Sequence, residues 1–287
     1  MRDRIAGCIL GGALGDAWGC PWEGKPGPIQ FAVPDRLVLS DDTQLTLATC
    51  ESIIECGRVD PAHLASAFAR WYQTRHIRGL GSSTFKAMRD LAAGVHWAVA
   101  GARGEFAAGN GAAMRIAPLA FLLDPADPGQ RVVICDVCRI THHNDEAYAG
   151  ALAVMLAIRS ALNDEPNLLI AVADGLPDSR VRDRLVELSR LKETPSDVAA
   201  KFGSSGYVVE SVPLALYCAQ AICVETLPNV LSAAIRAGGD TDTIASMAGQ
   251  VAGTKVGRNA IPNELISAIE GSDELLEIVE GFAAFVG

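Results

Sequence analysis

Aromatic residues are scarce in this 287-residue chain, at 6% of the sequence, although hydrophobic residues of all kinds make up 49%. An apolar content this high argues against intrinsic disorder. Ala and Gly are abundant, with 28 glycines in all, and small side chains let helices approach one another closely. We therefore expect a compact helical protein rather than a β-sandwich.

Positive charge is also in short supply. The chain has 24 Lys and Arg against 34 Asp and Glu, for a net charge of −10, and no basic stripe appears. This balance argues against a nucleic-acid backbone as the main partner, although a local patch could still hold a nucleotide.

No apolar run reaches the ~18 uncharged residues that a membrane span needs, so we expect no membrane partner. The N-terminus "MRDRIAGCILGGALGDAWG" imitates a secretory signal, with a basic start and a short apolar stretch. That stretch is rich in Gly and continues directly into Asp16, which argues against a signal. We expect a cytoplasmic protein.

A disulfide framework is not evident either. Eight cysteines are present, at positions 8, 20, 50, 56, 135, 138, 218 and 223, and most lie in apolar, helical runs. We expect reduced thiols packed as small hydrophobes. Zinc is an alternative at Cys135, Cys138, His142 and His143, but no second Cys–x2–Cys pair completes a finger or ribbon.

Linkers and repeats are lacking, so residues 1–287 are predicted to form a single domain. Start and stop signals indicate about a dozen helices in an all-α bundle. Helices are expected at 42–57, 60–75, 82–94, 145–162, 195–203, 209–222 and 227–239, with two amphipathic pieces in 263–286. Residues 160–184 are the one loose stretch, and strand-like runs at 29–33, 36–40 and 131–135 are few and short.

Two acid clusters lie about 200 residues apart. "LSDDTQLT" contains Ser40, Asp41 and Asp42, and "RAGGDTDTIASMAGQ" contains Asp240 and Asp242. Each cluster carries hydroxyl side chains and opens an apolar helical run. Helix capping explains one acid at each site, but not two at both.

These acids and hydroxyls are hard oxygen donors, which suit Mg²⁺, Ca²⁺ or Mn²⁺. Divalent cations would neutralise carboxylates that otherwise repel one another in a buried setting. Paired metals can hold a water and polarise a substrate oxygen. The residues alone therefore predict a binuclear metal site, but they do not indicate its substrate.

A glycine-rich turn in "AAGNGAAMRIAPLA" comes before a run of small residues. Its backbone N–H groups could cradle an anion, although an ordinary helix start is the plainer alternative. In "ITHHNDEAYAGA", Thr141 and His142 precede another Ala-rich helix. A lone histidine in such a place is more often a cap or a satisfied core group than a functional one.

Taken in order, these stretches resemble the ADP-ribosylglycohydrolase family. The resemblance runs through nearly the whole chain, from "GCILGGALGDAWGCPWEG" through "LSDDTQLTLAT", "RGLGSSTFKAMRDL", "GNGAAMRIAPLA", "THHNDEAYAGA" and "GYVVESVPLALYCA" to "RAGGDTDTIASMAGQVAG". It implies an all-α orthogonal bundle with a binuclear Mg²⁺ site, which Mn²⁺ fills in some members. The chain has Ser40 where many members have Thr, and "THHND" lacks the proline that often follows the Thr-His pair.

The resemblance also implies roles for individual residues. The metal ligands would be Ser40, Asp41, Asp42, Asp240, Asp242 and Thr243. The ADP-ribose pocket would be lined by Gly109, Asn110, Gly111, Ala112, Met114 and His142. Glu23 in "PWEG" aligns with the family's loop glutamate beside the scissile ribose, so Glu23, Asp41 and Asp242 are the candidates for moving the catalytic proton.

The expected reaction is hydrolysis of the C1″ bond that joins ADP-ribose to a protein side chain or a small leaving group. An arginine linkage is favoured by analogy with bacterial members, whereas serine-linked and O-acetyl-ADP-ribose remain open. Two alternatives are a non-catalytic ADP-ribose reader and an immunity protein that blocks an ADP-ribosyltransferase by contact. Both acid clusters are intact, which argues against a reader. A monomer is expected.

Overall fold

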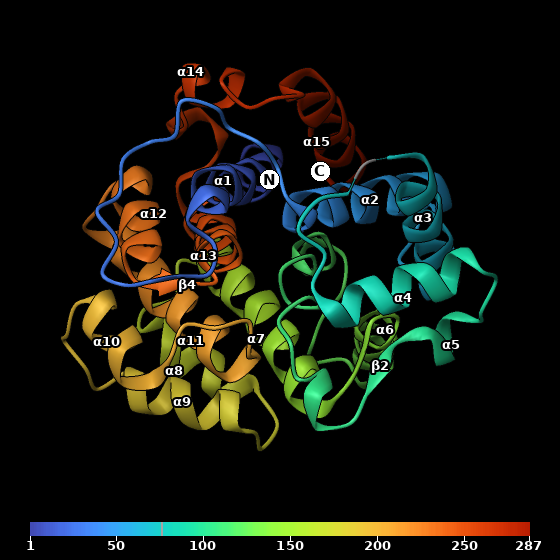
Figure 1. Ribbon diagram of the computed structural model, residues 1–287, viewed down its shortest axis with the longest axis horizontal. Coiled ribbons are helices and arrows are strands. Elements are labelled where there is room, and N and C mark those ends of the chain that lie inside the picture. The colour runs from blue at the N-terminus through green and yellow to red at the C-terminus, as the bar shows by residue number, and fades with distance from the viewer. Residues whose placement is uncertain (76) are drawn as a thin grey trace.

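The computed structural model describes residues 1–75 and 77–287, and the regular secondary structure of this part of the chain is almost entirely helical (Figure 1). The α-helices are α1 (Arg2–Gly19), α2 (Asp41–Cys56), α3 (Pro61–Thr74), α4 (Ser82–Ala92), α5 (Trp97–Ala100), α6 (Pro128–Arg139), α7 (Asp145–Leu162), α8 (Leu168–Gly175), α9 (Arg180–Leu188), α10 (Pro195–Phe202), α11 (Val208–Ala219), α12 (Leu227–Arg236), α13 (Thr241–Val256), α14 (Asn263–Ser267) and α15 (Ser272–Val286). The all-α prediction is confirmed.

The strands are short pairs that tie loops together. β1 (Lys25–Pro26) pairs antiparallel with β4 (Gly238–Gly239), and β2 (Ala102–Arg103) pairs in parallel with β3 (His142–His143). None of the helices in the described residues is both long and apolar enough to cross a membrane.

The two helices at the centre of Figure 1, α1 and α13, pack against each other along their whole length. Glycines at positions 7, 11 and 15 of α1 make this possible, and we call them the glycine seam. A Cβ on Gly7 would lie 2.4 Å from the Gly253 carbonyl oxygen, and one on Gly11 would lie 2.4 Å from that of Gly249. Only helices without side chains at these positions can approach so closely.

The other helices surround this central pair. In Figure 1, α2, α3 and α4 lie to one side, and α8 to α12 lie to the other. Helices α7, α11 and α12 pack on α13, and α15 packs on α1 and α2. The start of α2 is thereby brought beside the start of α13.

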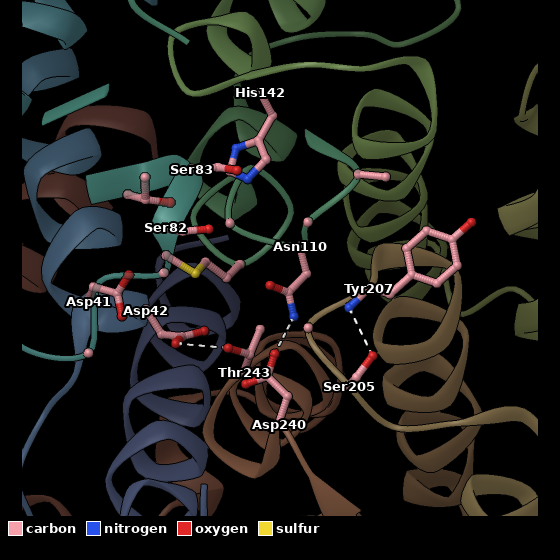
Figure 2. A pocket seen from close by; sticks show the side chains of 18 of the residues that line it. Asp41, Asp42, Ser82, Ser83, Asn110, His142, Ser205, Tyr207, Asp240 and Thr243 are labelled. Carbon is pink, nitrogen blue, oxygen red and sulfur yellow. Dashed lines mark hydrogen bonds between the residues drawn. The ribbon is translucent and has the colours of Figure 1, made fainter. Parts of the chain in front are cut away.

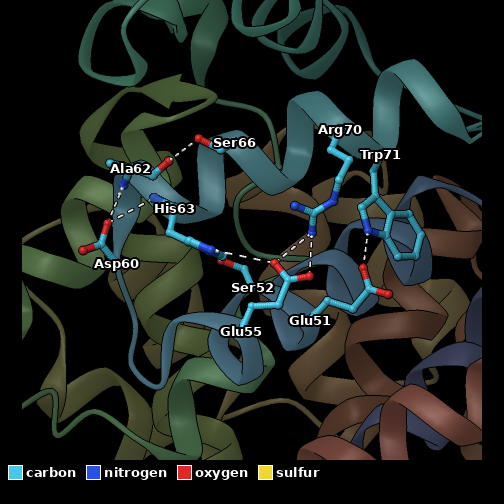
Figure 3. A network of polar contacts seen from close by, with 9 residues as sticks. All are labelled: Glu51, Ser52, Glu55, Asp60, Ala62, His63, Ser66, Arg70 and Trp71. Atoms are coloured by element: carbon cyan, nitrogen blue, oxygen red, sulfur yellow. Dashed lines mark hydrogen bonds and ion pairs between the residues drawn. The ribbon is translucent and has the colours of Figure 1, made fainter.

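Polar contacts fasten α2 to α3 (Figure 3). The Trp71 indole donates to Glu51 over 2.6 Å, and His63 Nδ1 lies 2.8 Å from the Ser52 hydroxyl. His63 Nε2 lies 3.7 Å from Glu55. Although this serine–histidine–glutamate set has the residue types of a hydrolytic triad, Ser52 is only 1% exposed, so substrate cannot reach it.

Two expectations about local structure are wrong. Residues 160–184, expected to be loose, contain all of α8 and the start of α9, because Val181, Leu185 and Leu188 share one buried face of α9. The strand-like run 131–135 lies within α6, where Asp127 caps the helix through the backbone N–H of Gln130. Capping and burial of one face outweigh the β preference of its valines.

Candidate active site

A pocket of about 690 Å³ opens where the starts of α2 and α13 meet the loops before α4, α7 and α11 (Figure 2). It brings together most of the residues that the sequence had singled out. Eleven of them line it: Glu23, Asp41, Asp42, Gly109, Asn110, Gly111, Met114, His142, Asp240, Asp242 and Thr243. Ser40 and Ala112 are buried next to these residues in the chain. Their individual roles remain predictions.

Ser40 shapes the first acid cluster as the N-cap of α2. Its hydroxyl accepts a hydrogen bond from the Asp42 backbone N–H over 3.3 Å and lies 3.2 Å from Asp42 Oδ2, to which it can donate. The Asp41 backbone N–H donates to the Arg78 carbonyl over 2.7 Å. The cap therefore fixes both acids at the positive end of the helix dipole.

Asp16 on α1 lies beneath this cluster and is a site residue that no sequence motif indicated. It is 0% exposed and accepts hydrogen bonds from the Ser40 N–H (3.1 Å), the Thr43 N–H (3.2 Å) and the Thr43 hydroxyl (2.5 Å). Burial nevertheless raises its pKa. The available signal was a single carboxylate within a long apolar, glycine-rich helical run.

The second acid cluster, at the start of α13, is positioned by the two glycines that precede it. Gly238 and Gly239 have φ values of 78° and 81°, which favour glycine, and they pair with the loop that follows Glu23. Asn110 Nδ2 then donates to Asp240 Oδ2 over 2.7 Å, and the Thr243 hydroxyl donates to Asp42 Oδ2 over 3.1 Å (Figure 2). The two clusters form one continuous polar network.

The buried carboxylates of this network repel one another, so a bound cation would stabilise their ionised form. Burial, followed by repulsion from neighbouring acids, raises the pKa of Asp41 to about 8 and that of Asp242 to about 10. The same causes raise the pKa of Asp42 well above its usual range. Asp42 Oδ1 is buried without a hydrogen-bond partner among the described residues, as expected of an oxygen meant for a cation.

Carboxylate oxygens gather at cation-binding distances in two overlapping sets. Oxygens of Asp16, Asp42 and Asp242 lie within 4.8 Å of one another, and so do oxygens of Glu23, Asp240 and Asp242. Such oxygen-only sets fit a hard divalent cation. Because Asp16 is already engaged by several hydrogen bonds, it supports the cluster rather than resembling a free ligand.

The glycine-rich turn forms the pocket wall opposite the acids. The His142 ring packs on the turn, so that a Cβ on Gly109 would lie 3.1 Å from His142 Nε2, and one on Gly111 would lie 2.9 Å from Cε1. His142 is 2% exposed, and burial, followed by the charge of Arg115, lowers its pKa to about 3. It is therefore a neutral imidazole at physiological pH.

A comparison with known families covers nearly the whole chain. The model of a family described as ADP-ribosylglycohydrolase matches residues 1–286. The chain belongs to the ADP-ribosylglycohydrolase family. The resemblance inferred from the motifs is therefore confirmed, as is the prediction of a glycohydrolase enzyme.

Individual relatives in this family align over most of their length. The chain is 27% identical to the ADP-ribosylhydrolase ARH3 of Homo sapiens, covering 94% of this chain and 90% of the relative. It is 26% identical to the ADP-ribosylarginine hydrolase Tri1 of Pseudomonas putida, covering 97% and 77%. A solved structure titled ADP-ribosylglycohydrolase-related protein complex superposes with a TM-score of 0.77 at 27% identity, over 100% of this chain and 99% of that one.

The zinc alternative has no support in the described residues. Their candidate metal-binding groups contain neither Cys135 nor Cys138, nor either of the adjacent histidines. All eight cysteines are free, as expected, but only Cys8, Cys50, Cys138 and Cys218 are fully buried. Cys223 is exposed, so the expectation of uniformly buried thiols is too broad.

Several pocket residues were not assigned a role from the sequence. Ser82, Ser83 and Thr84 line the pocket from the start of α4, and Phe106 and Tyr207 line it from separate loops. Phe106 is 100% exposed. An exposed aromatic ring at a pocket suits stacking on a planar group, but nothing in the local pattern "GEFAAG" distinguishes it from a loop residue.

Proposed function

We propose that this protein hydrolyses the C1″ glycosidic bond of ADP-ribosylated proteins, preferably arginine-linked, at a binuclear Mg²⁺ site that Mn²⁺ can also fill. The observation that carries this proposal is the buried acid network bridging α2 and α13, in which Asp42 Oδ1 has no hydrogen-bond partner among residues 1–75 and 77–287. The full-length match to the family supports the substrate class, and the name of the Tri1 relative supports the arginine linkage.

Six residues would hold the ions: Ser40, Asp41, Asp42, Asp240, Asp242 and Thr243. When bound, two divalent cations neutralise these acids, orient the ribose hydroxyls and lower the pKa of a water. The network described above fixes the donor atoms in advance, since Asn110 orients Asp240 and Thr243 orients Asp42. Preorganised ligands reduce the reorganisation that the reaction requires.

Bond cleavage develops positive charge at C1″ in an oxocarbenium-like state. The surrounding carboxylates suit that charge. Glu23 lies on the loop tied to β4, and its carboxyl faces the acids; partial burial and repulsion from Asp240 and Asp16 raise its pKa. A raised pKa suits a carboxyl that exchanges a proton with the water or the leaving group. Asp41 and Asp242 are the alternative groups for this role.

The deciding experiment is a panel of arginine-, serine- and acetyl-linked ADP-ribose substrates, each assayed for ADP-ribose release with Mg²⁺ and with Mn²⁺. We expect release from the arginine-linked substrate to be fastest. Asp178→Asn changes a side chain that is 98% exposed and should leave ADP-ribose release unchanged, so it is the control for Asp→Asn variants of the acid clusters. Tight ADP-ribose binding without release from any substrate would instead identify a reader, and inhibition of a transferase without release would identify an immunity protein.

Three further predictions accompany this proposal. We propose that residues 1–287 act as one domain, that the protein works as a monomer, and that it acts in the cytoplasm. Size-exclusion chromatography with light scattering tests the oligomeric state. Limited proteolysis tests the single domain, because a chain with two domains would yield two stable fragments.

A further inference from the structure

Arg115 is a fully buried cation with no acidic partner in the described part of the chain. Its guanidinium lies 4.7 Å from the centre of the Phe68 ring, and its Nη2 donates to the Val137 carbonyl over 3.3 Å and to the Thr141 hydroxyl oxygen over 2.8 Å. Burial lowers its pKa only to about 10, so it stays protonated at neutral pH. Burying a lone charge is costly, which calls for an explanation.

The explanation starts at Thr141, which connects Arg115 to the pocket. The Thr141 hydroxyl oxygen lies 2.8 Å from His142 Nδ1 as well as 2.8 Å from Arg115 Nη2. Both Thr141 and Arg115 are 0% exposed. Arg115 can only donate, so the Thr141 oxygen is an acceptor in that contact and its own proton is free to go elsewhere.

Because Arg115 can only donate to Thr141, the direction of the hydrogen bond between the Thr141 hydroxyl and His142 Nδ1 can be inferred. If His142 Nδ1 carried a proton, Thr141 would accept twice, and its hydroxyl proton would have no acceptor in the described part of the chain, in a site closed to water. A buried donor left unpaired costs about 1–3 kcal/mol. Thr141 therefore donates to Nδ1, and the proton of the neutral imidazole resides on Nε2.

His142 Nε2 is the atom that reaches the pocket. It lies against Gly109, 3.1 Å from where a Cβ would be, and His142 lines the pocket wall. Nε2 has no hydrogen-bond partner within residues 1–75 and 77–287. His142 is 2% exposed and lines the pocket, so a proton on Nε2 would be a donor without a partner among the described residues at the pocket wall.

We propose that Thr141, held by Arg115, is a positioning residue that locks His142 in the Nε2–H tautomer, so that the pocket presents a neutral hydrogen-bond donor to an acceptor oxygen of the substrate. The identity of that substrate as an ADP-ribose conjugate rests on the function proposed above. The tautomer itself is a property of the free protein.

The tautomer is tested by ¹H–¹⁵N correlation spectra of histidine-labelled protein without ligand. His142→Gln identifies the His142 signals among those of five histidines. We expect wild-type protein to show protonated Nε2 and bare Nδ1. Thr141→Ser, which keeps the hydroxyl, should show the same, whereas the isosteric Thr141→Val should populate the Nδ1–H form. An Nδ1–H signal in wild-type protein, or an unchanged pattern in the valine variant, overturns the lock.

Calorimetry of ADP-ribose binding to the same variants tests whether the Nε2–H tautomer of His142 contributes to binding. Loss of one neutral hydrogen bond should weaken ADP-ribose binding by Thr141→Val by about fivefold, with Thr141→Ser staying close to wild type. A changed tautomer with unchanged affinity overturns the binding role. If wild-type protein binds no ADP-ribose, the proposed function fails while the tautomer result is unaffected, so the two failures are distinguishable.

Discussion

The Thr243 hydroxyl donates a hydrogen bond to Oδ2 of Asp42 over 3.1 Å, across a separation of 201 residues in the chain. This contact joins the two acid clusters. Asp42 Oδ2 also lies 3.2 Å from the Ser40 hydroxyl, and the other oxygen, Oδ1, has no hydrogen-bond partner in the described residues. Thr243 and Ser40 together engage Oδ2, which leaves Oδ1 as the Asp42 oxygen available to a cation.

Removal of this hydroxyl is our first prediction. Thr243→Val should lower Mg²⁺ affinity and ADP-ribose release by between about tenfold and about 100-fold, because Asp42 loses both an orienting donor and a neighbouring oxygen ligand. Thr243→Ser keeps the hydroxyl and serves as the matched control. Mg²⁺ titrations followed by calorimetry measure the effect, and equal affinity in the two variants would contradict it.

The second prediction concerns the metal itself. EDTA should abolish ADP-ribose release, and added Mg²⁺ or Mn²⁺ should restore it. Asp41→Asn and Asp240→Asn should abolish release without rescue by metal, because each removes a charged ligand. Full turnover in metal-free buffer would refute the metal site.

The third prediction concerns Asp16, which lies beneath the α2 cap. Asp16→Asn should lower the free energy of unfolding by ~2 kcal/mol, since an amide NH2 group would replace an acceptor facing the backbone donors of Ser40 and Thr43. Urea unfolding in EDTA measures this, with Asp178→Asn as a surface control. An unchanged midpoint would show that the cap does not depend on the Asp16 carboxylate.

The fourth prediction follows from the raised pKa values of Asp41 and Asp242, about 8 and about 10 in the folded protein without metal. In the unfolded chain an aspartate ionises near pH ~3.9. The folded state thus retains protons that the unfolded state has lost, and the stability of the metal-free protein falls as pH rises through the folded pKa values. Melts in EDTA between about pH 5 and about pH 9 should show this decline, with excess Mg²⁺ opposing it because metal binding strengthens as acids deprotonate.

The fifth prediction compares two glycines. Gly11→Ala places a Cβ 2.4 Å from the Gly249 carbonyl and should destabilise the fold by at least ~2 kcal/mol. Gly281→Ala in α15 is the matched control, because its Cβ would meet only Ile54 Cδ1 at an ordinary 3.7 Å. The control should be neutral or stabilising by up to ~1 kcal/mol, because alanine favours a helix interior. Thermal melts of the two variants separate these outcomes.

Capping residues and prolines at helix starts were sufficient to predict many of the helices. Asp60 and Pro61 predicted the start of α3, and the structure has Asp60 accepting from the backbone N–H groups of Ala62 and His63. Helix α8 lacks such a signal, because it starts after Asn167 at a positive φ of 57° without a side-chain cap. Burial of Leu169 and Val172 stabilises α8, which packs on its chain neighbours α7 and α9 and on α11, and no cap or turn residue signals this packing.

Some residues of the candidate site were predictable from the sequence and others were not. Asp41, Asp42, Asp240 and Asp242 are recognisable because paired acids at a helix start exceed what capping needs. The roles of Asp16 and Thr141 depend on partners from other elements, and a single acid or threonine in an apolar run has no pattern of its own. The sequence therefore indicated the ligand candidates, but not the orienting roles of Asp16 and Thr141.

The glycine seam has a consequence for how sequence variation in this protein should be interpreted. Each seam position controls the separation of α1 and α13, and α13 carries Asp242 at its first turn while α1 carries Asp16. A saturation mutagenesis screen scored by catalysis would therefore flag glycines deep in the bundle alongside the acids. Those glycines set the spacing of the two acid clusters without lining the pocket, so their sensitivity to substitution should not be taken as evidence of a catalytic role.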